Sequence, residues 1–452
     1  MGEIARRFRY LAVLGTLCAV ATAAMAEGPA SPETLALDQA VALALANNRN
    51  VSIADQEVQR AEQRIGAARA RRLPNLDLQV MAGTTLNTIR VSFPGGAFGT
   101  YPGIGPIPAT DTDVEAPRTV SGNINATLSQ PLTQLHRLGL NVKANELARD
   151  IEQQKLHEER AAVVAEVRRV YYSLLQTQSA LQAKQERVRA YRELERVVGE
   201  QVAREAALPA DALDVKARLA GEEYELAGLE NDLETGKEQM NLLLGRELTH
   251  DFSLVAVPET SAEEEDLASA IARAVEKRPD LAQARIAIDQ ADADRRAKKA
   301  ERIPDVSLSV TYVSFVNVDL LPRNVAMAGL QLKWEPFDWG RRGKETAEKE
   351  LQLEQARSRR REAEDRVRLD VAQSFRKLHE ARLLIEAERL GRDAAAERLR
   401  AVTSRHQQEA ALLKDVLDAQ AAMSAAHNQY DRALLAFWTA KADLQKALGE
   451  EQ

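Results

Sequence analysis

Few side chains in this 452-residue chain have the types and spacing that catalysis requires. His157-Glu158-Glu159 and His379-Glu380 lie in charged helical stretches but lack the second histidine of a zinc-binding helix motif. No Gly-rich phosphate loop precedes a helix, and no Gly-x-Ser-x-Gly nucleophile turn occurs. The six histidines show no ligand spacing, so we expect them at the surface. We therefore predict that the protein is not an enzyme and uses no metal and no cofactor.

The N-terminus excludes thiol chemistry as well. Basic residues precede an apolar run from Leu11 to Val20, and Ala24-Met25-Ala26 then forms a small-residue cleavage signal. This order predicts a secretory signal peptide over residues 1–26. The alternative is a membrane anchor, but the run is short for a bilayer span. The only cysteine, Cys18, lies in this run, so the mature chain has no thiol.

Four aspartates remain as candidates because they form a duplicated pattern. Asp211 and Asp214 recur as Asp415 and Asp418, each pair directly after a short break between two helical stretches. Aspartate beside a helix start is commonly a cap, which is the structural alternative for Asp211 and Asp415. Whether these carboxylates cap helices or act on a solute depends on the elements that position them.

Those elements are duplicated along the chain. Leu37–Val80 aligns without gaps on Leu267–Val310, and Glu205-Ala206-Ala207-Leu208 matches Glu409-Ala410-Ala411-Leu412. Self-similarity over this length indicates repeated structural units. We predict two structural repeats, residues 27–250 and 267–452, joined by a linker at 251–266.

Long helices dominate each repeat. The first contains helices expected at 137–206 and 211–245, and the second contains helices at 343–408 and 412–449, with shorter helices before them. Apolar residues recur at coiled-coil spacing, as at Val163, Val167 and Leu174. At 1.5 Å per residue, the first long helix would extend about 105 Å. A plain intramolecular coiled coil accounts for such stripes, and this is what we expect here.

Each repeat also contains one β-hairpin. In the second, at about 305–337, Val306, Leu308, Val310 and Tyr312 alternate with polar residues, which predicts a strand with one apolar face. In the first, at about 76–132, similar strands flank a Gly- and Pro-rich segment expected to be a long loop at 93–117. The chain therefore has four such strands.

Four strands cannot close a membrane barrel, because known barrels begin at about eight strands. A secreted chain with apolar-faced strands must therefore share a barrel between copies; three copies would supply twelve strands, and two would supply eight. Trp334, Phe337 and Trp339 follow the last strand, where an aromatic girdle would meet the membrane boundary. Ordinary packing at a strand–helix junction is the alternative role of these three residues.

These features together resemble the TolC-like outer membrane efflux protein family. The resemblance covers nearly the whole mature chain. It depends on the duplicated junctions Arg72-Leu73-Pro74 and Arg302-Ile303-Pro304, on Leu244-Gly245 and Leu448-Gly449, and on Asp415-Val416-Leu417-Asp418-Ala419 with its copy at 211–215. The order of elements is more diagnostic than any single motif.

The resemblance implies a mainly α fold with a small β part. Three chains would form a long antiparallel α-helical coiled-coil barrel that continues into a 12-stranded β-barrel, with four strands per chain. It implies a homotrimer in outer-membrane lipid that projects into the periplasm as the exit duct of a tripartite efflux or type I secretion system. The partners would be a periplasmic adaptor protein and an inner-membrane pump.

The resemblance also assigns roles to the turns between the long helices. Acidic rings at the constriction, which favour cations, would be formed by Asp415 and Asp418, with Asp211 and Asp214 as their copies. The turns would form the tip that meets the adaptor, but they depart from the family's usual Val-Gly-Leu-like sequence. The tip residues are Ala206, Ala207, Leu208, Pro209, Ala410, Ala411, Leu412 and Leu413.

One other class of protein fits part of the pattern. A periplasmic coiled-coil adaptor or scaffold would explain the helices and the signal peptide, but it leaves four amphipathic strands at duplicated positions unexplained. The net charge of −7 disfavours nucleic acid as a partner. The sequence leaves the exported substrate open among drugs, metal ions and proteins.

Overall fold

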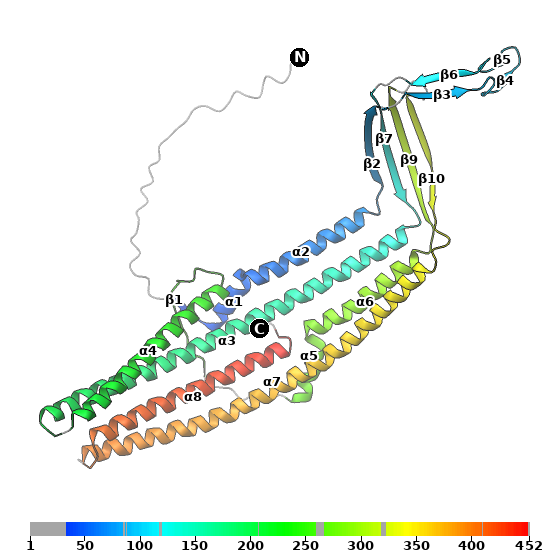
Figure 1. The fold of residues 1–452 in the computed structure, drawn as a ribbon. Coiled ribbons are helices and arrows are strands. Elements are labelled where there is room, and N and C mark those ends of the chain that lie inside the picture. The colour runs from blue at the N-terminus through cyan, green and yellow to red at the C-terminus, as the bar shows by residue number, and fades with distance from the viewer. Residues whose placement is uncertain are drawn as a thin grey trace, which may run out of the picture.

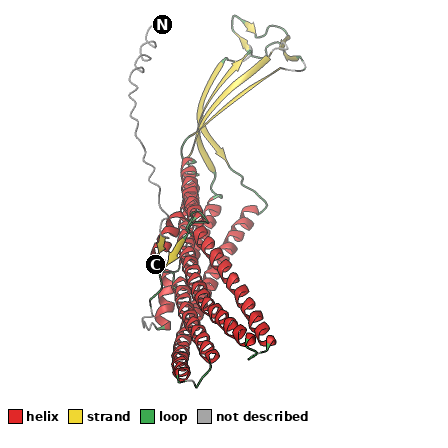
Figure 2. Ribbon diagram, turned by 90° about the vertical axis from the view of Figure 1, so that its left-hand side faces the viewer, coloured by secondary structure: helices red, strands yellow, loops and turns green. Residues whose placement is uncertain are grey.

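The computed structural model describes residues 33–84, 86, 88–116, 120–206, 208–258, 266–317, 322–408 and 410–450. The chain forms a long bundle of helices with a β-sheet extending from one end (Figures 1 and 2). The expected signal peptide at 1–26 lies outside the described residues. The helices are α1 (Leu37–Asn47), α2 (Arg49–Ala70), α3 (Leu135–Ala203), α4 (Pro209–Leu243), α5 (Leu267–Lys277), α6 (Pro279–Ala300), α7 (Arg341–Gln407) and α8 (Leu413–Ala447).

Local sequence explains where these helices start. Asn48 precedes α2 and its side-chain oxygen accepts a hydrogen bond from the Asn50 amide at 2.9 Å. Asp266 caps α5 in the same way through the Ala268 amide at 3.2 Å. Proline occupies the first position of α4 and of α6, where its missing N–H has no cost. The aligned helices begin at matching positions but use different residues: Arg278 precedes α6 where Asn48 precedes α2, and Ala36 precedes α1 where Asp266 precedes α5.

The four long helices lie side by side in the order α4, α3, α8, α7, as Figure 1 shows for the lower part of the bundle. The apolar stripes of the sequence form the contacts. Val167 is fully buried in one core and Val367 and Val371 in the other. The expectation of an intramolecular coiled-coil packing is therefore confirmed for these stripes. The two outermost helices, α4 and α7, each have one packed side and one open side.

One four-stranded antiparallel sheet has the order β10-β9-β7-β2. The hairpin of each repeat stays together, β10 with β9 and β7 with β2, and the two hairpins join where β7 of the first repeat pairs with β9 of the second. The hydrogen-bonded register aligns Leu128 with Val310 and Thr127 with Thr311. The strands are β2 (Asn75–Thr84), β7 (Val120–Pro131), β9 (Asp305–Val316) and β10 (Asn324–Lys333).

The segment 93–117 is not the irregular loop that its composition suggests. It belongs to a hairpin arm in which β3 (Ile89–Phe93) pairs with β6 (Thr112–Ala116), and β4 (Thr100–Tyr101) pairs with β5 (Gly105–Pro106). The glycines and prolines form the turns, while cross-strand pairs such as Arg90 with Glu115 and Ser92 with Asp113 hold the short strands together. The arm extends from the end of the sheet (Figure 1).

The linker expected at 251–266 also contains regular structure. β8 (Phe252–Leu254) pairs in parallel with β1 (Glu33–Leu35), far away in sequence. A strand of three residues is too short for an alternating apolar pattern to be recognised in the sequence. Its partner strand lies more than 200 positions away, so only the tertiary structure shows this pair. Residues 259–265 of the linker lie outside the described residues. None of the described helices has the length and apolar character to cross a bilayer.

Candidate functional site

The four-stranded sheet has two chemically different faces. Even-numbered residues of all four strands share one face, because each aligned pair joins even with even positions. The side chains of this face are largely solvent-exposed in the single chain, with Leu76 and Leu330 on the outer strands more exposed than Leu128 and Val310 on the inner ones. The apolar residues of this face include Leu76, Leu78, Val80, Ile124, Ala126, Leu128, Val306, Leu308, Val310, Tyr312, Ala328, Leu330 and Leu332, with polar residues such as Gln130, Ser314 and Asn324 toward the strand ends.

The odd-numbered face is mostly polar. Thr127 and Thr311 lie opposite each other on its inner strands, with their hydroxyl oxygens 3.4 Å apart. Each strand has 10 or 12 residues, which matches the 9–11 residues that a tilted strand needs to cross a bilayer. An apolar face, a polar face and this strand length are the properties of one wall segment of a transmembrane pore. The polar face contains Asp77, Gln79, Asn123, Asn125, Ser129, Ser307, Ser309, Gln331 and Lys333.

The three aromatic residues after β10 lie at the junction with α7. The Phe337 and Trp339 rings contact each other edge to face, with centroids 4.8 Å apart, and Trp339 is 90% exposed. Trp339 has φ 56°, a left-handed conformation that is costly for a bulky residue. Asp338 holds the turn by accepting from the Gly340 and Arg342 amides, each at 3.1 Å, and these backbone bonds together with the nearby Arg342 and Arg341 charges lower the pKa of its carboxyl. The junction therefore presents its aromatic rings to the surroundings instead of packing them.

The two turns at the far end of the helices have the same backbone design. In the first, the Ala206 amide donates to the Gln201 carbonyl at 2.8 Å, and in the second the Ala410 amide donates to the Arg405 carbonyl at 2.9 Å. The side chains of Leu208 and Leu412 project into solvent as large exposed apolar groups at both tips. Ala207 lies outside the described residues. The expected tip residues are thus brought together at one end of the bundle, opposite the sheet (Figure 1).

The four aspartates differ in the partners of their carboxylates. Asp211 and Asp415 each accept a hydrogen bond from a backbone amide three residues earlier, at 3.2 Å from Leu208 and 3.0 Å from Leu412. This is half of a capping box, because a leucine at the cap position offers no side-chain oxygen in return. Asp214 pairs with Arg218 at 3.0 Å. Asp418 is exposed and, within the described residues, has no hydrogen-bond or ion-pair partner, so of the four aspartates it is the one available to a solute.

The second tip has one contact that the sequence did not reveal. His406 Nδ1 lies 2.8 Å from the Ala411 carbonyl oxygen and ties the end of α7 to the turn. The aligned position in the first repeat is Val202, so the duplication contains no signal for this bond.

Comparison with known proteins agrees with this geometry. The sequence profile of the outer membrane efflux protein family matches residues 40–246 and 270–450, which are the two repeats. The chain belongs to the outer membrane efflux protein family. No curated protein sequence matches this efflux protein significantly. Its family function is that of an outer-membrane exit duct in tripartite efflux systems, located in the outer membrane and projecting into the periplasm.

Solved structures show the same fold at low sequence identity. The efflux protein resembles the Campylobacter jejuni CmeC outer membrane channel with a TM-score of 0.75 and 14% identity, over 91% of this chain and 85% of that one. It resembles CusC with a TM-score of 0.72 and 17% identity over 92% of both chains. It resembles the Neisseria gonorrhoeae MtrE outer membrane channel in its open state with a TM-score of 0.68 and 18% identity, over 92% of this chain and 89% of that one.

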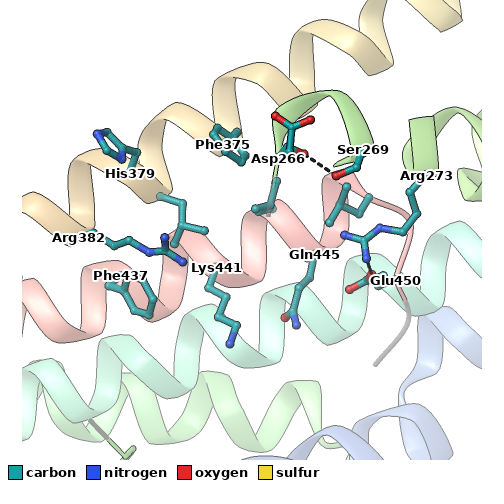
Figure 3. Close-up of a pocket in the computed structure, with 13 residues that line it drawn as sticks. Asp266, Ser269, Arg273, Phe375, His379, Arg382, Phe437, Lys441, Gln445 and Glu450 are labelled. Carbon is teal, nitrogen blue, oxygen red and sulfur yellow. Dashed lines mark hydrogen bonds and ion pairs between the residues drawn. The ribbon is translucent and has the colours of Figure 1, made fainter. Parts of the chain in front are cut away.

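A groove of about 700 Å³ lies between α5, α7 and α8 of the efflux protein (Figure 3). Its floor contains Phe375 and Phe437, and its rim contains Arg273, which pairs with Glu450 at 3.5 Å. No group of three or more His, Cys, Asp or Glu side chains in the described part of the chain is placed to hold a metal ion.

In the first repeat, the position that corresponds to this groove is filled by the paired strands β1 and β8. There the buried Tyr171 hydroxyl donates to the Val255 carbonyl at 2.8 Å and accepts from the Val255 amide at 3.1 Å, while the Leu35 carbonyl lies 3.1 Å away. Burial raises the pKa of Tyr171. Phe375 occupies the aligned position in the second repeat and has no hydroxyl to bind a strand. The two repeats thus share a backbone plan but differ in what their outer grooves contain.

Proposed function

We propose that three copies of this protein close one 12-stranded β-barrel, with a helical tunnel below it, and act together as a passive export conduit without catalysing a reaction. The observation that carries the proposal is the two-faced sheet with open edges. In the single chain β10 and β2 each have one edge without a partner strand among the described residues. Because strand directions alternate over an even number of strands, β10 of one copy would meet β2 of the next in antiparallel orientation.

The orientation of the wall follows from its two faces. The apolar even-numbered face would contact lipid, and the polar odd-numbered face would line the water-filled lumen. Trp334, Phe337 and Trp339 would lie at the membrane boundary on the periplasmic side, where amphipathic rings favour the headgroup region. Their exposure in the single chain supports this role, since packed junction aromatics would be covered.

The tips are proposed to be both gate and docking surface. The exposed Leu208 and Leu412, with Ala206, Pro209, Ala410, Ala411 and the neighbouring Ala207 and Leu413, would contact the periplasmic adaptor that connects the duct to an inner-membrane pump. Asp418, with its free carboxylate, would form the main acidic ring of the constriction. Asp415 and Asp211, engaged as caps, and Asp214, paired with Arg218, would contribute less.

The experiment measures ion selectivity of the purified protein in planar bilayers. Asp418→Asn is expected to reduce the preference for cations over anions, because a three-fold ring loses all its charge. Asp214→Asn serves as the matched control, since its carboxylate lies in the copied position but is paired with Arg218 at 3.0 Å. Protein that is monomeric by mass in detergent and forms no pores would refute the conduit. Pores whose selectivity is unchanged by Asp418→Asn would refute the ring alone.

A further inference from the structure

The four junctions between the helices and the sheet form one continuous band. Helices α2, α3, α6 and α7 all meet the sheet at the same end (Figure 1). Hydrogen bonds tie neighbouring junctions together, because the Gln130 side-chain amide donates to the Arg72 carbonyl at 3.0 Å and the Thr133 hydroxyl donates to the Pro304 carbonyl at 2.7 Å. We call this band the rim. It consists of residues 69–74, 131–137, 295–304 and 334–345.

The rim is basic in a protein that is acidic as a whole. It contains 12 Lys and Arg against 4 Asp and Glu, whereas the whole chain contains 61 against 68. The four acidic side chains of the rim already have partners, which are lysine or arginine for three of them and two backbone amides for Asp338. Five exposed cations have no side-chain partner among the residues that the structure describes. They are Arg71, Arg72, Lys299, Arg302 and Lys344.

The helix dipole does not explain these cations. A cation is favoured near the C-terminal end of a helix and disfavoured near its N-terminal end. Arg71 and Lys299 lie at the C-terminal ends of α2 and α6. Arg341, Arg342 and Lys344, however, begin α7, whose first turn contains no acidic residue. The property that the two groups share is their place beside the sheet, so the reason for the charge lies outside the helices.

The duplicated Arg-x-Pro junctions place an arginine beside an exposed apolar side chain. In both repeats the arginine amide donates to the carbonyl three residues earlier, at 3.0 Å for Arg72 and 3.3 Å for Arg302. Leu73 and Ile303 follow these arginines and are 64% and 49% exposed. The apolar face of the sheet begins directly after them. Long cationic side chains in such a place lie along the lipid and extend their charged ends to the headgroups.

The opposite end of the sheet has the opposite charge. Over residues 88–116 the arm that extends from it contains Asp111, Asp113 and Glu115 against the single cation Arg90. An anionic lipid surface attracts clustered Lys and Arg that lie next to it. Of the two ends, only the one that continues into the helices therefore matches anionic lipid.

We infer that the rim binds the headgroup phosphates of anionic phospholipids in the leaflet that faces the periplasm. The inference rests on the proposed membrane wall, because it requires the sheet to cross the bilayer with the helices on the periplasmic side. Arg72 and Arg302 would bind phosphate while Leu73 and Ile303 contact the acyl chains. A guanidinium suits this role, since it can bind one phosphate through two parallel hydrogen bonds. The rim would thereby fix the depth of the duct in the membrane.

Titration of phospholipid into the purified protein in a nonionic detergent tests the inference. A lipid that binds the folded state raises the melting temperature, and the concentration dependence gives an apparent Kd. Phosphatidylglycerol, which is anionic, should bind more tightly than phosphatidylethanolamine, which is zwitterionic. Arg72→Gln combined with Arg302→Gln should raise the Kd for phosphatidylglycerol by about 5- to 30-fold, since each cation near an anionic surface contributes about fivefold.

Two further double variants make the result specific to the rim. Lys216→Gln with Arg398→Gln is the matched control, because it removes two exposed cations near the other end of the helices that have no side-chain partner in the described part of the chain. Its Kd should equal that of the wild type. Lys299→Gln with Lys344→Gln changes the rim without touching the Arg-x-Pro junctions, and it should also weaken phosphatidylglycerol binding.

Three results would contradict the inference or the proposal beneath it. Equal affinity for the two lipids, or an equal loss in the control variant, would overturn the inference while leaving a pore-forming conduit standing. Displacement of phosphatidylglycerol by an equal concentration of inorganic phosphate would assign the site to free phosphate and also overturn it. Wild-type protein that forms no pores in planar bilayers would instead overturn the proposed conduit.

Discussion

Gly245→Ala should destabilise the protein far more than the same change at the copied Gly449. Both glycines follow a leucine at the end of a long helix, and both have a left-handed φ, 67° for Gly245 and 77° for Gly449. An L-residue in that conformation costs about 1–2 kcal/mol at either site. The two sites differ in what an added methyl group would meet.

A Cβ on Gly245 would lie 2.4 Å from the Asn47 carbonyl oxygen and 3.0 Å from its carbon, both backbone atoms that cannot rotate away. On Gly449 the nearest atom would be Arg278 Cα at 3.1 Å, which a small shift relieves. Overpacking of the first kind adds about 1–3 kcal/mol. We therefore expect Gly245→Ala to cost about 2–5 kcal/mol and Gly449→Ala about 1–2 kcal/mol.

Thermal unfolding of the detergent-solubilised protein, followed by circular dichroism at 222 nm, measures the difference. Gly199→Ala is the control of opposite sign, because Gly199 lies inside α3 with nothing within 4 Å of its Cβ position. Alanine there should stabilise the helix by up to about 1 kcal/mol. Equal melting temperatures for Gly245→Ala and Gly449→Ala would refute the claim that the α1–α4 contact, and not the turn conformation, dominates.

Three further predictions concern other parts of the chain. Tyr171→Phe should cost about 0.5–1.5 kcal/mol in the free energy of unfolding, because the hydroxyl's bonds with the Val255 carbonyl and amide are lost while that amide keeps its 3.3 Å bond to the Leu35 carbonyl. Tyr172→Phe, whose ring is buried without a hydrogen bond from its hydroxyl within the described residues, should cost less in the same melt. The pKa of Glu33 is lowered, mainly by its hydrogen bond with His250, so its contribution to stability is present above the ordinary value of 4.5 and lost as pH falls through the lower folded pKa. The protection of the 252–255 amides against hydrogen exchange, relative to the intrinsic rate at each pH, should fall there in the wild type. An equally steep fall in Glu33→Gln would contradict this. Trp339→Gly should relieve the strain of the left-handed backbone conformation but weaken membrane anchoring. Flotation with lipid vesicles would detect the weaker anchoring as a smaller bound fraction. An unchanged bound fraction would argue against the aromatic girdle.

Periodicity explains how much of the fold was predictable. The 3- and 4-residue spacing around Val167 and Val371 and the alternation around Val310 identified helices and strands, because each pattern reports which side of one element is buried. The pairing of β7 with β9 and of β1 with β8 was not predictable. Strand partners depend on contacts between residues far apart in sequence, and no local pattern encodes them.

At the candidate site, too, the sequence predicted some features and only the structure showed others. Sequence duplication placed four aspartates at two turns, but the structure distinguished Asp415, bound to the Leu412 amide, from Asp418, which has no partner among the residues that the structure describes. Turn residues dominate the composition of the arm containing β3 and β6 and therefore predict a loop, whereas cross-strand pairs such as Arg90 with Glu115 stabilise paired strands there. A carboxylate's partners, like a strand's, are set by the backbone geometry around it.

By itself the sequence determined the two repeats, the long helices, the four amphipathic strands and the family resemblance. These follow from residue order, because the spacing of the apolar residues within each element shows which of its sides is buried. The tertiary structure decided which helices lie at the open sides of the bundle, which groove is filled and which carboxylate is free. Those properties arise where separate elements meet, and the free energy of such contacts depends on distances that residue order alone does not specify.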